Sequence, residues 1–187
     1  KSFREFLDDQ GFFCVDSPIF TPNACEGTST LFQTEYFEDT AYLTQSGQLY
    51  AEASAMALGK VYCFGPTFRA EKSKTRRHLT EFWMLEPEMA WADLTDVCDL
   101  AEGMIRYTIR QLLEHAQADL ADLERDPATL EAWDCEWPRL PYDDAATMLL
   151  EWQKEGKYES EFKPGDDLGA PDETVLGEHF GCTVMVT

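Results

Sequence analysis

Two stretches of apolar, β-prone residues flank a polar, strongly basic segment in the first half of this 187-residue chain. They run over residues 61–68 and 82–89 and predict two strands joined as a hairpin with a long loop. A cationic loop held between two strands can grip phosphate oxygens, whereas the alternative is a solvated hairpin tip that carries charge. The loop holds five basic side chains within nine residues: Arg69, Lys72, Lys74, Arg76 and Arg77.

This basic cluster stands out because the chain as a whole is strongly acidic, with a formal net charge of -21. Such a charge disfavours a protein that coats nucleic acid without regard to its sequence, since neutralising phosphates needs a cationic surface. It leaves room for a nucleic-acid enzyme with a local basic site, and it also fits a host with high internal salt. A hydrophobic content of 44% and an aromatic content of 13% indicate one sizeable globular domain.

Cysteine usage and the apolar runs exclude several classes of protein. Six cysteines are scattered without a CxxC pair or histidines at ligand spacing, which argues against a zinc site and against a disulfide framework. No apolar run approaches the roughly 20 residues that span a membrane. The first residues lack the apolar core of a signal peptide. We therefore expect a cytoplasmic protein with no membrane partner and no metal ligands in this chain.

Hydrophobic periodicity predicts the remaining elements of the first half. A helix is expected over residues 1–10, a strand over 12–20 bent at Pro18, and a strand over 36–43 with a turn near Glu38. A further helix is expected before Gly59, with an inner stripe made by Leu49, Ala53, Met56 and Ala57.

In the second half, apolar residues at helical spacing predict a long helix from Asp96 that ends before Pro127. The prolines and tryptophans of residues 127–141 indicate an irregular connector. Short helices are expected over residues 143–152 and 173–180, and a strand over 182–186.

The hairpin also matches a known sequence pattern. Residues 68–71 (Phe-Arg-Ala-Glu), the basic loop and residues 77–82 (Arg-His-Leu-Thr-Glu-Phe) resemble motif 2 of the class II aminoacyl-tRNA synthetases. Within that class, residues 62–71 and 81–88 are most similar to the asparagine-specific enzymes of the bacterial kind. Three further segments agree with this class in order and spacing: residues 11–18 resemble motif 1, residues 25–27 the mobile loop over the amino-acid site, and residues 46–49 the amino-acid-binding segment.

The resemblance runs from about Phe3 to the last residue and implies an α+β fold, with an antiparallel sheet flanked by helices. It implies a partial catalytic domain over residues 1–187, with motif 1 at about 3–20, motif 2 at about 61–90 and the region between motifs 2 and 3 at about 95–187. No Gly-x-Glu-Arg pattern of motif 3 occurs. We expect motif 3, the anticodon-binding β-barrel and the ligands of Mg²⁺ outside this segment, which leaves the sheet incomplete at its C-terminal side.

The resemblance assigns the nucleotide-binding roles to motif 2. Arg69 would grip the α-phosphate of ATP and stabilise the charge that develops during catalysis, and Glu71 would accept a hydrogen bond from the adenine amino group. Phe82 would stack on adenine, while Arg77 and His78 would meet the terminal phosphates. From sequence alone, a salt bridge for Glu71, a core position for Phe82 and a solvated role for Arg77 and His78 stay open.

The amino-acid side of the site is implied by the other segments. Ser46, Gln48 and Glu86 would surround the substrate's α-amino and α-carboxylate groups, and Glu26 would close over its ammonium. Where related aspartate enzymes place a lysine, this chain has Ala51, followed by Glu52. Glu52 could accept a hydrogen bond from the carboxamide of asparagine, or it could simply face solvent.

These roles together imply an asparagine–tRNA ligase activity. The enzyme would activate asparagine with ATP and Mg²⁺ to asparaginyl-adenylate and pass it to tRNA(Asn), as a homodimer formed through motif 1. Alone, this segment is expected to be inactive. Two alternatives stay open: a paralogue that makes asparagine from aspartate and ammonia, and a non-catalytic module that binds an amino acid or ATP.

Overall fold

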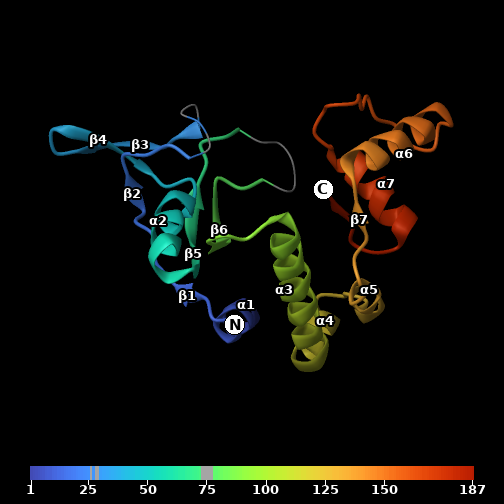
Figure 1. The fold of residues 1–187 in the computed structure, drawn as a ribbon, viewed down its shortest axis with the longest axis horizontal. Coiled ribbons are helices and arrows are strands. Elements are labelled where there is room, and N and C mark those ends of the chain that lie inside the picture. Colours follow the sequence, from blue (N-terminus) through green and yellow to red (C-terminus); the bar gives the residue numbers. More distant parts are fainter. Residues whose placement is uncertain (26, 28–29, 73–77) are drawn as a thin grey trace. The chain divides into compact units, whose positions relative to one another are not determined.

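The computed structural model describes residues 1–25, 27, 30–72 and 78–187. The chain divides into two compact units, one covering residues 3–93 and the other residues 94–187 (Figure 1). Both units combine helices with strands, so the α+β class predicted from the sequence is confirmed. In the described part of the chain, every helix is too short or too polar to cross a membrane.

The first unit is built around the hairpin of β5 (Lys60–Phe68) and β6 (Glu81–Met89). The two strands pair antiparallel along their whole length, as the sequence predicts. The short strand β1 (Phe13–Cys14) adds in parallel to the other edge of β5, which gives the order β1-β5-β6. Residues 73–77 of the hairpin loop lie outside the described residues.

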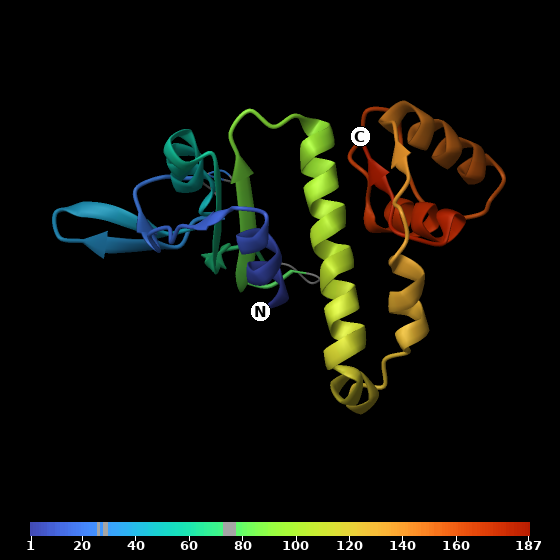
Figure 2. The ribbon, with the colours of Figure 1, turned by 60° about the horizontal axis from the view of Figure 1, so that its bottom comes forward.

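A second sheet has the order β2-β4-β3, from β2 (Phe20–Thr21), β4 (Asp39–Leu43) and β3 (Gln33–Tyr36), all antiparallel. The hairpin β3–β4 projects from the rest of its unit, and its turn is at the predicted place (Figures 1 and 2). The single strand predicted over residues 12–20 is wrong. The chain around Pro18 leaves the first sheet after β1 and joins the second as β2, since proline cannot donate to a ladder.

Two helices complete the first unit. Helix α1 (Ser2–Asp9) confirms the predicted N-terminal helix and buries Leu7. Helix α2 (Gln48–Leu58) packs on β5 and β6, but its predicted inner stripe is wrong. Ala51 and Ala55 are the buried positions, whereas Leu49, Ala53, Met56 and Ala57 are exposed. Small side chains on the inner face let the helix approach the sheet closely.

The second unit consists mainly of helices, with one parallel pair of short strands. The predicted long helix is divided into α3 (Leu94–His115) and α4 (Gln117–Asp122). The connector predicted to be irregular contains α5 (Pro127–Trp133), because Asp126 caps it by accepting a hydrogen bond from the backbone N–H of Ala128 at 2.9 Å. The remaining elements are β7 (Arg139–Leu140), α6 (Tyr142–Lys154), α7 (Ala170–Phe180) and β8 (Met185–Val186).

The core of the second unit lies between α6 and α7. Its buried members are Ala145, Ala146, Leu149, Trp152, Phe162 and Leu176. The short helix predicted over residues 143–152 is thereby confirmed, as is the one predicted over 173–180, although both extend further at their N-terminal ends. Of the strand predicted over 182–186, only residues 185–186 pair, in parallel with β7.

Candidate functional site

One face of the β5–β6 hairpin carries the side chains that the sequence analysis singled out on these strands. Residues directly opposite each other share a face, and the register pairs Cys63 with Glu86 and Thr67 with Phe82. Arg69 follows on the same face, and its guanidinium carbon lies 5.6 Å from the centroid of the Phe82 ring. The structure thus brings a cation and an aromatic ring together at one end of this face and a carboxylate further along it.

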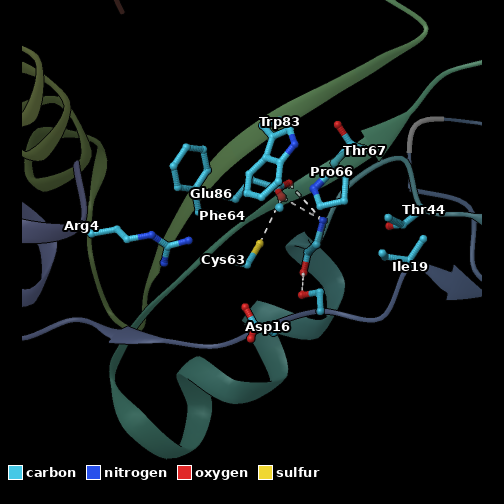
Figure 3. A pocket seen from close by; sticks show the side chains of 13 residues that line it. Arg4, Asp16, Ile19, Thr44, Cys63, Phe64, Pro66, Thr67, Trp83 and Glu86 are labelled. Carbon is cyan, nitrogen blue, oxygen red and sulfur yellow. Dashed lines mark hydrogen bonds between the residues drawn. The ribbon is translucent and has the colours of Figure 1, made fainter. Parts of the chain in front are cut away.

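Glu86 is the centre of a buried hydrogen-bond cluster, and only 9% of it is exposed. The Ser46 hydroxyl donates to its Oε1, and the Gly47 backbone N–H lies 3.2 and 3.0 Å from its two carboxylate oxygens. The Cys63 thiol donates to Oε2 at 3.1 Å (Figure 3). These donors fix the orientation of a carboxylate that has no cation among these partners, which is the arrangement expected of a site that receives a cationic group.

Cys63 acts in this cluster as a neutral donor. Burial raises the pKa of its thiol to about 12, and the hydrogen bond to Glu86 and the negative charge of Glu86 raise it in the same direction. A thiol with this pKa stays protonated at neutral pH, so it keeps its hydrogen for Glu86 and is a poor nucleophile. The sequence analysis gave this cysteine no role and missed its contact with Glu86.

Gly47 lies against β5 so closely that no other residue fits without a shift. A Cβ added at Gly47 would lie 2.4 Å from the Cys63 sulfur and 2.8 Å from the Ser17 hydroxyl oxygen. The Ser17 hydroxyl in turn donates to the Gly47 carbonyl at 3.2 Å. A cavity of about 280 Å³ opens beside this contact, with Arg4, Trp83 and Glu86 in its wall (Figure 3).

The Gly47→Ala substitution is expected to lower the free energy of unfolding by about 1–3 kcal/mol, because overpacking forces a side chain or the backbone to move. Adding Cys63→Ala should recover part of that loss, since it removes the atom that the new Cβ meets first. A double-mutant cycle by denaturant unfolding measures this, with a coupling of at least about 1 kcal/mol expected between contacting residues. Gly65→Ala is the matched control, because nothing lies within 4 Å of a Cβ there. Strict additivity of the two changes would contradict the proposed contact.

Gln48 joins the cluster from the first turn of α2. Its backbone N–H donates to Ser46 Oγ at 3.1 Å, and its side-chain amide donates to Glu52 Oε1 at 2.8 Å. The Cys25 thiol lies 3.8 Å from the amide oxygen of Gln48. The structure therefore brings Ser46, Gln48 and Glu86 together, and Glu52, although exposed, borders them through the Gln48 amide.

Gln45 is a residue of this region that the sequence analysis missed. Only 1% of it is exposed, and its side-chain amide nitrogen donates to the Gly27 carbonyl at 3.0 Å and to Thr30 Oγ1 at 2.6 Å. Its amide oxygen accepts from the Cys25 backbone N–H at 3.1 Å. Gln45 thus holds the chain on both sides of residue 26, and Glu26 itself lies outside the described residues. The polar run at residues 45–48 was the available signal, but it did not show which amide is buried.

A second carboxylate on the same face of β6 was also missed. Burial raises the pKa of Glu88, and the nearby charges of Glu52 and Glu86 raise it further. Three carboxylates therefore create a negative potential next to the cluster. The period-2 alternation of the strand, which places Glu86 and Glu88 on one face, could have revealed it.

Replacing Glu88 with glutamine is expected to stabilise the protein near pH 7 and to have little effect at pH 4. A carboxyl group whose pKa is raised in the folded state contributes stability only while protonated, and this contribution is lost as the pH rises through the folded pKa. The substitution removes the charge that causes this loss. Thermal unfolding at several pH values measures it, with an increase in Tm of a few degrees expected at pH 7 only. An equal shift at every pH would contradict the assigned cause.

The remaining predicted residues belong to the loop of the hairpin. Glu71 and His78 are exposed at its two ends, and Arg77 lies outside the described residues. The structure therefore supplies no contact of Arg77 and does not bring Glu71 into the Glu86 cluster. Within residues 1–25, 27, 30–72 and 78–187, no group of three or more His, Cys, Asp or Glu side chains is arranged to hold a metal ion.

The chain is similar in sequence to a known family of proteins. Residues 1–183 match the family of class II tRNA synthetases (D, K and N). The chain is 58% identical over 186 residues to the asparagine–tRNA ligase of Koribacter versatilis and 53% identical over 192 residues to that of Sorangium cellulosum. All of the chain is matched, but it spans only 42% and 43% of those two proteins.

The fold has a solved counterpart. The crystal structure of asparaginyl-tRNA synthetase from Pyrococcus horikoshii, complexed with asparaginyl-adenylate, superimposes with a TM-score of 0.87 at 42% sequence identity. The alignment covers 97% of this chain and 40% of that one.

Proposed function

We propose that this chain, which belongs to the class II tRNA synthetases (D, K and N), contributes one wall of a site in which asparagine is activated with ATP and passed to tRNA(Asn). The observation that carries the proposal is the shared face of the hairpin. Arg69 and Phe82 lie together on it, and the buried Glu86 cluster lies further along the same strands. The whole activity belongs to the full-length protein, because the chain spans less than half of its relatives.

In this proposal the nucleotide binds at the Arg69 end. Arg69 contacts the α-phosphate, where a guanidinium can form two parallel hydrogen bonds to phosphate oxygens. Phe82 stacks on the adenine ring, and Glu71 accepts a hydrogen bond from its amino group. His78 and Arg77, from the loop, contact the terminal phosphates. The cation–π contact of Arg69 with Phe82 supports this arrangement, since it holds the guanidinium beside the face on which the base stacks.

The amino acid binds at the Glu86 end. The carboxylate of Glu86, held by Ser46 and Gly47, receives the substrate ammonium, and Gln48 and Ser46 contact its polar groups. Glu26, on the segment whose neighbours Gln45 holds, closes over the ammonium. The carboxylates of Glu52 and Glu88 add to the negative potential that favours a cationic group here.

The chemistry then needs no nucleophile from the protein. A carboxylate oxygen of asparagine attacks the α-phosphorus of ATP, a new P–O bond forms, and the bond to the bridging oxygen breaks to release pyrophosphate. Arg69 stabilises the charge that builds up on the α-phosphoryl oxygens, and the fixed donors around Glu86 orient the attacking substrate. Mg²⁺ would neutralise part of the phosphate charge, but the described residues do not form a metal site.

Selectivity for asparagine over aspartate is proposed to depend on Glu52. Its carboxylate accepts a hydrogen bond from Gln48 and has a second oxygen that can accept one from the substrate carboxamide. The position that would carry a lysine in the aspartate enzymes is Ala51, which is fully buried against Ala55 and Val61. An aspartate side chain would therefore meet a carboxylate and no cation.

We further propose that the full-length protein acts as a homodimer in the cytoplasm. The segment that resembles motif 1 exposes large apolar side chains in this unit, among them Phe13 (55%), Ile19 (42%) and Phe20 (57%). Apolar side chains grouped on one segment are typical of an interface. A symmetric contact between two copies would cover them.

The full-length protein is expected to catalyse asparagine-dependent exchange of pyrophosphate into ATP, with little exchange when aspartate replaces asparagine. The Glu52→Lys substitution should lower the ratio of kcat/KM for asparagine to that for aspartate by at least about tenfold, because it replaces an acceptor by a cation. Glu38→Lys, the same charge change at an exposed position of the β3–β4 turn, is the matched control.

Three results would contradict the proposed selectivity or the proposed ligase function. An unchanged preference for asparagine in Glu52→Lys would rule out Glu52 as the selective residue. Ammonia-dependent formation of asparagine without tRNA would indicate an asparagine-making paralogue instead. If calorimetry detects no binding of ATP or of asparagine, the ligase function is wrong.

A further inference from the structure

The side-chain amide of Gln48 lies between two neighbours of opposite hydrogen-bonding character. Its nitrogen donates to Glu52 Oε1 at 2.8 Å, and its oxygen lies 3.8 Å from the Cys25 thiol, which can donate to it. Turning the amide over would place its oxygen against the Glu52 carboxylate and its NH2 group against the thiol hydrogen. The two contacts therefore favour the same orientation of the amide, and Cys25 supplies its contact from a different segment of the chain.

Gln45 holds Cys25 in this place. Its amide oxygen accepts from the Cys25 backbone N–H at 3.1 Å, and its amide nitrogen donates to the Gly27 carbonyl at 3.0 Å and to Thr30 Oγ1 at 2.6 Å. Only 1% of Gln45 is exposed, so losing one of these bonds would leave a buried polar group without its partner. One buried side chain thus fixes three described residues of this segment.

The two ends of the segment are attached without the help of Gln45. At one end, the hydroxyl groups of Thr21 and Tyr50 are joined by a hydrogen bond of 2.8 Å. At the other end, the Ala70 backbone N–H donates to the Thr30 carbonyl at 2.8 Å. A change at Gln45 is therefore expected to act on the residues between these ends and to leave the rest of the unit folded.

We infer that Gln45 is a positioning residue for asparagine binding, and that it acts through Cys25 on the side-chain amide of Gln48. The inference rests on the proposed ligase function and deepens it, because Gln48 and Glu52 are proposed to meet the polar groups of the substrate. A Gln48 amide that is already oriented loses less conformational freedom when asparagine binds. Neither Gln45 nor Cys25 has to touch the substrate for this effect.

The Gln45→Glu substitution in the full-length protein tests the positioning role. At pH 8 it keeps an acceptor for the Cys25 backbone N–H but loses the NH2 group that donates to Gly27 and Thr30. The KM for asparagine is expected to rise about tenfold, because the Gln48 amide must then be ordered by the substrate. The kcat and the KM for ATP should stay within a few-fold. Asparagine-dependent pyrophosphate exchange measures all three constants.

Lowering the pH should rescue this variant. Burial raises the pKa of a carboxyl group, and the protonated form carries an O–H that can donate again. The KM for asparagine of Gln45→Glu should therefore approach that of the unsubstituted protein at pH 6. Gln33→Glu, the same change at an exposed position of β3, is the matched control and should have little effect at either pH. A defect of equal size at pH 6 and pH 8 would contradict a role through hydrogen bonds.

Cys25→Ala tests the route from Gln45 to Gln48. It removes the thiol but keeps the backbone N–H that donates to Gln45, and it should raise the KM for asparagine several-fold. In the double variant with Gln45→Glu, the increase should be smaller than the product of the two single increases, because both changes act on one amide. Fully multiplicative increases would overturn the inference that Gln45 acts through Cys25.

Failure of this inference is distinguishable from failure of the proposed ligase function. If the unsubstituted protein shows no asparagine-dependent exchange, the ligase function is wrong and the inference fails with it. If exchange is present but Gln45→Glu leaves the KM for asparagine unchanged, only the inference is wrong. Equal increases of the KM for asparagine and the KM for ATP would also overturn it. Should Gln45→Glu not fold, Cys25→Ala decides alone, since it changes one partly exposed thiol, and an unchanged KM for asparagine would then overturn the inference.

Discussion

Replacing Arg69 with alanine is expected to lower asparagine-dependent pyrophosphate exchange of the full-length protein by about a thousandfold or more, as for other arginines that stabilise phosphoryl-transfer charge. The guanidinium lies over Phe82 at the end of β5, where the proposal places the α-phosphate. The loss should appear mainly in kcat, because the charge that Arg69 stabilises is greatest in the transition state.

Arg69→Lys separates charge from geometry. It keeps the positive charge but loses the planar fork, so activity should recover only in part. Lys72→Ala is the matched control, since Lys72 is an exposed cation three residues further along the same loop. Because it lies outside the proposed phosphate contact, it should keep exchange within a few-fold of the unsubstituted protein. Equal losses in Arg69→Ala and Lys72→Ala would mean that the loop acts through its net charge, and Arg69 would then have no specific role.

The sequence predicts those features of the site that follow from the position of a residue along its own strand. It does not predict contacts that depend on how two strands pair. The apolar segments around the basic loop predict the hairpin, and period-2 alternation places Phe82 and Glu86 on one face. The contact of Cys63 with Glu86 could not be predicted in the same way. It depends on the pairing register of the two strands, which is fixed only when the loop is closed.

Helix α2 shows why a hydropathy pattern can select the wrong face. Periodicity favours Leu49 and Met56 as the inner positions, because they are the large apolar residues. The helix instead buries Ala51 and Ala55, which allow close approach to the sheet, and leaves the larger side chains exposed in this unit. Packing distance, which single-residue hydropathy does not contain, decides the orientation.

Gln45 and α5 were missed for a related reason. A buried glutamine is identified by the partners of its amide, and those partners lie on a segment 15 to 20 residues away in the chain. Helix α5 begins with a proline, which reads as a helix breaker unless Asp126 is recognised as the residue that caps it. Both features depend on specific hydrogen bonds and not on composition.

Replacing Glu86 with glutamine is expected to raise the KM for asparagine by about a hundredfold or more, because a buried charged partner of the substrate ammonium is lost. The amide can still accept hydrogen bonds from Ser46 and Gly47, so the fold should change little. The KM for ATP should stay within a few-fold, since the nucleotide binds at the Arg69 end. Pyrophosphate exchange at varied asparagine and ATP concentrations measures both constants.

Glu86→Ala is expected to act on stability as well. It leaves the buried donors of Ser46 and Gly47 without their acceptor, which should lower the free energy of unfolding by about 2–4 kcal/mol. Glu81→Gln, at an exposed position of the same strand, is the matched control and should change neither the KM for asparagine nor the KM for ATP. If Glu86→Gln raised the KM for ATP as much as that for asparagine, Glu86 would hold the site together without contacting the ammonium. Comparing the change in the KM for asparagine with the change in the KM for ATP therefore distinguishes a binding role of Glu86 from a purely structural one. The loss of stability in Glu86→Ala cannot make this distinction.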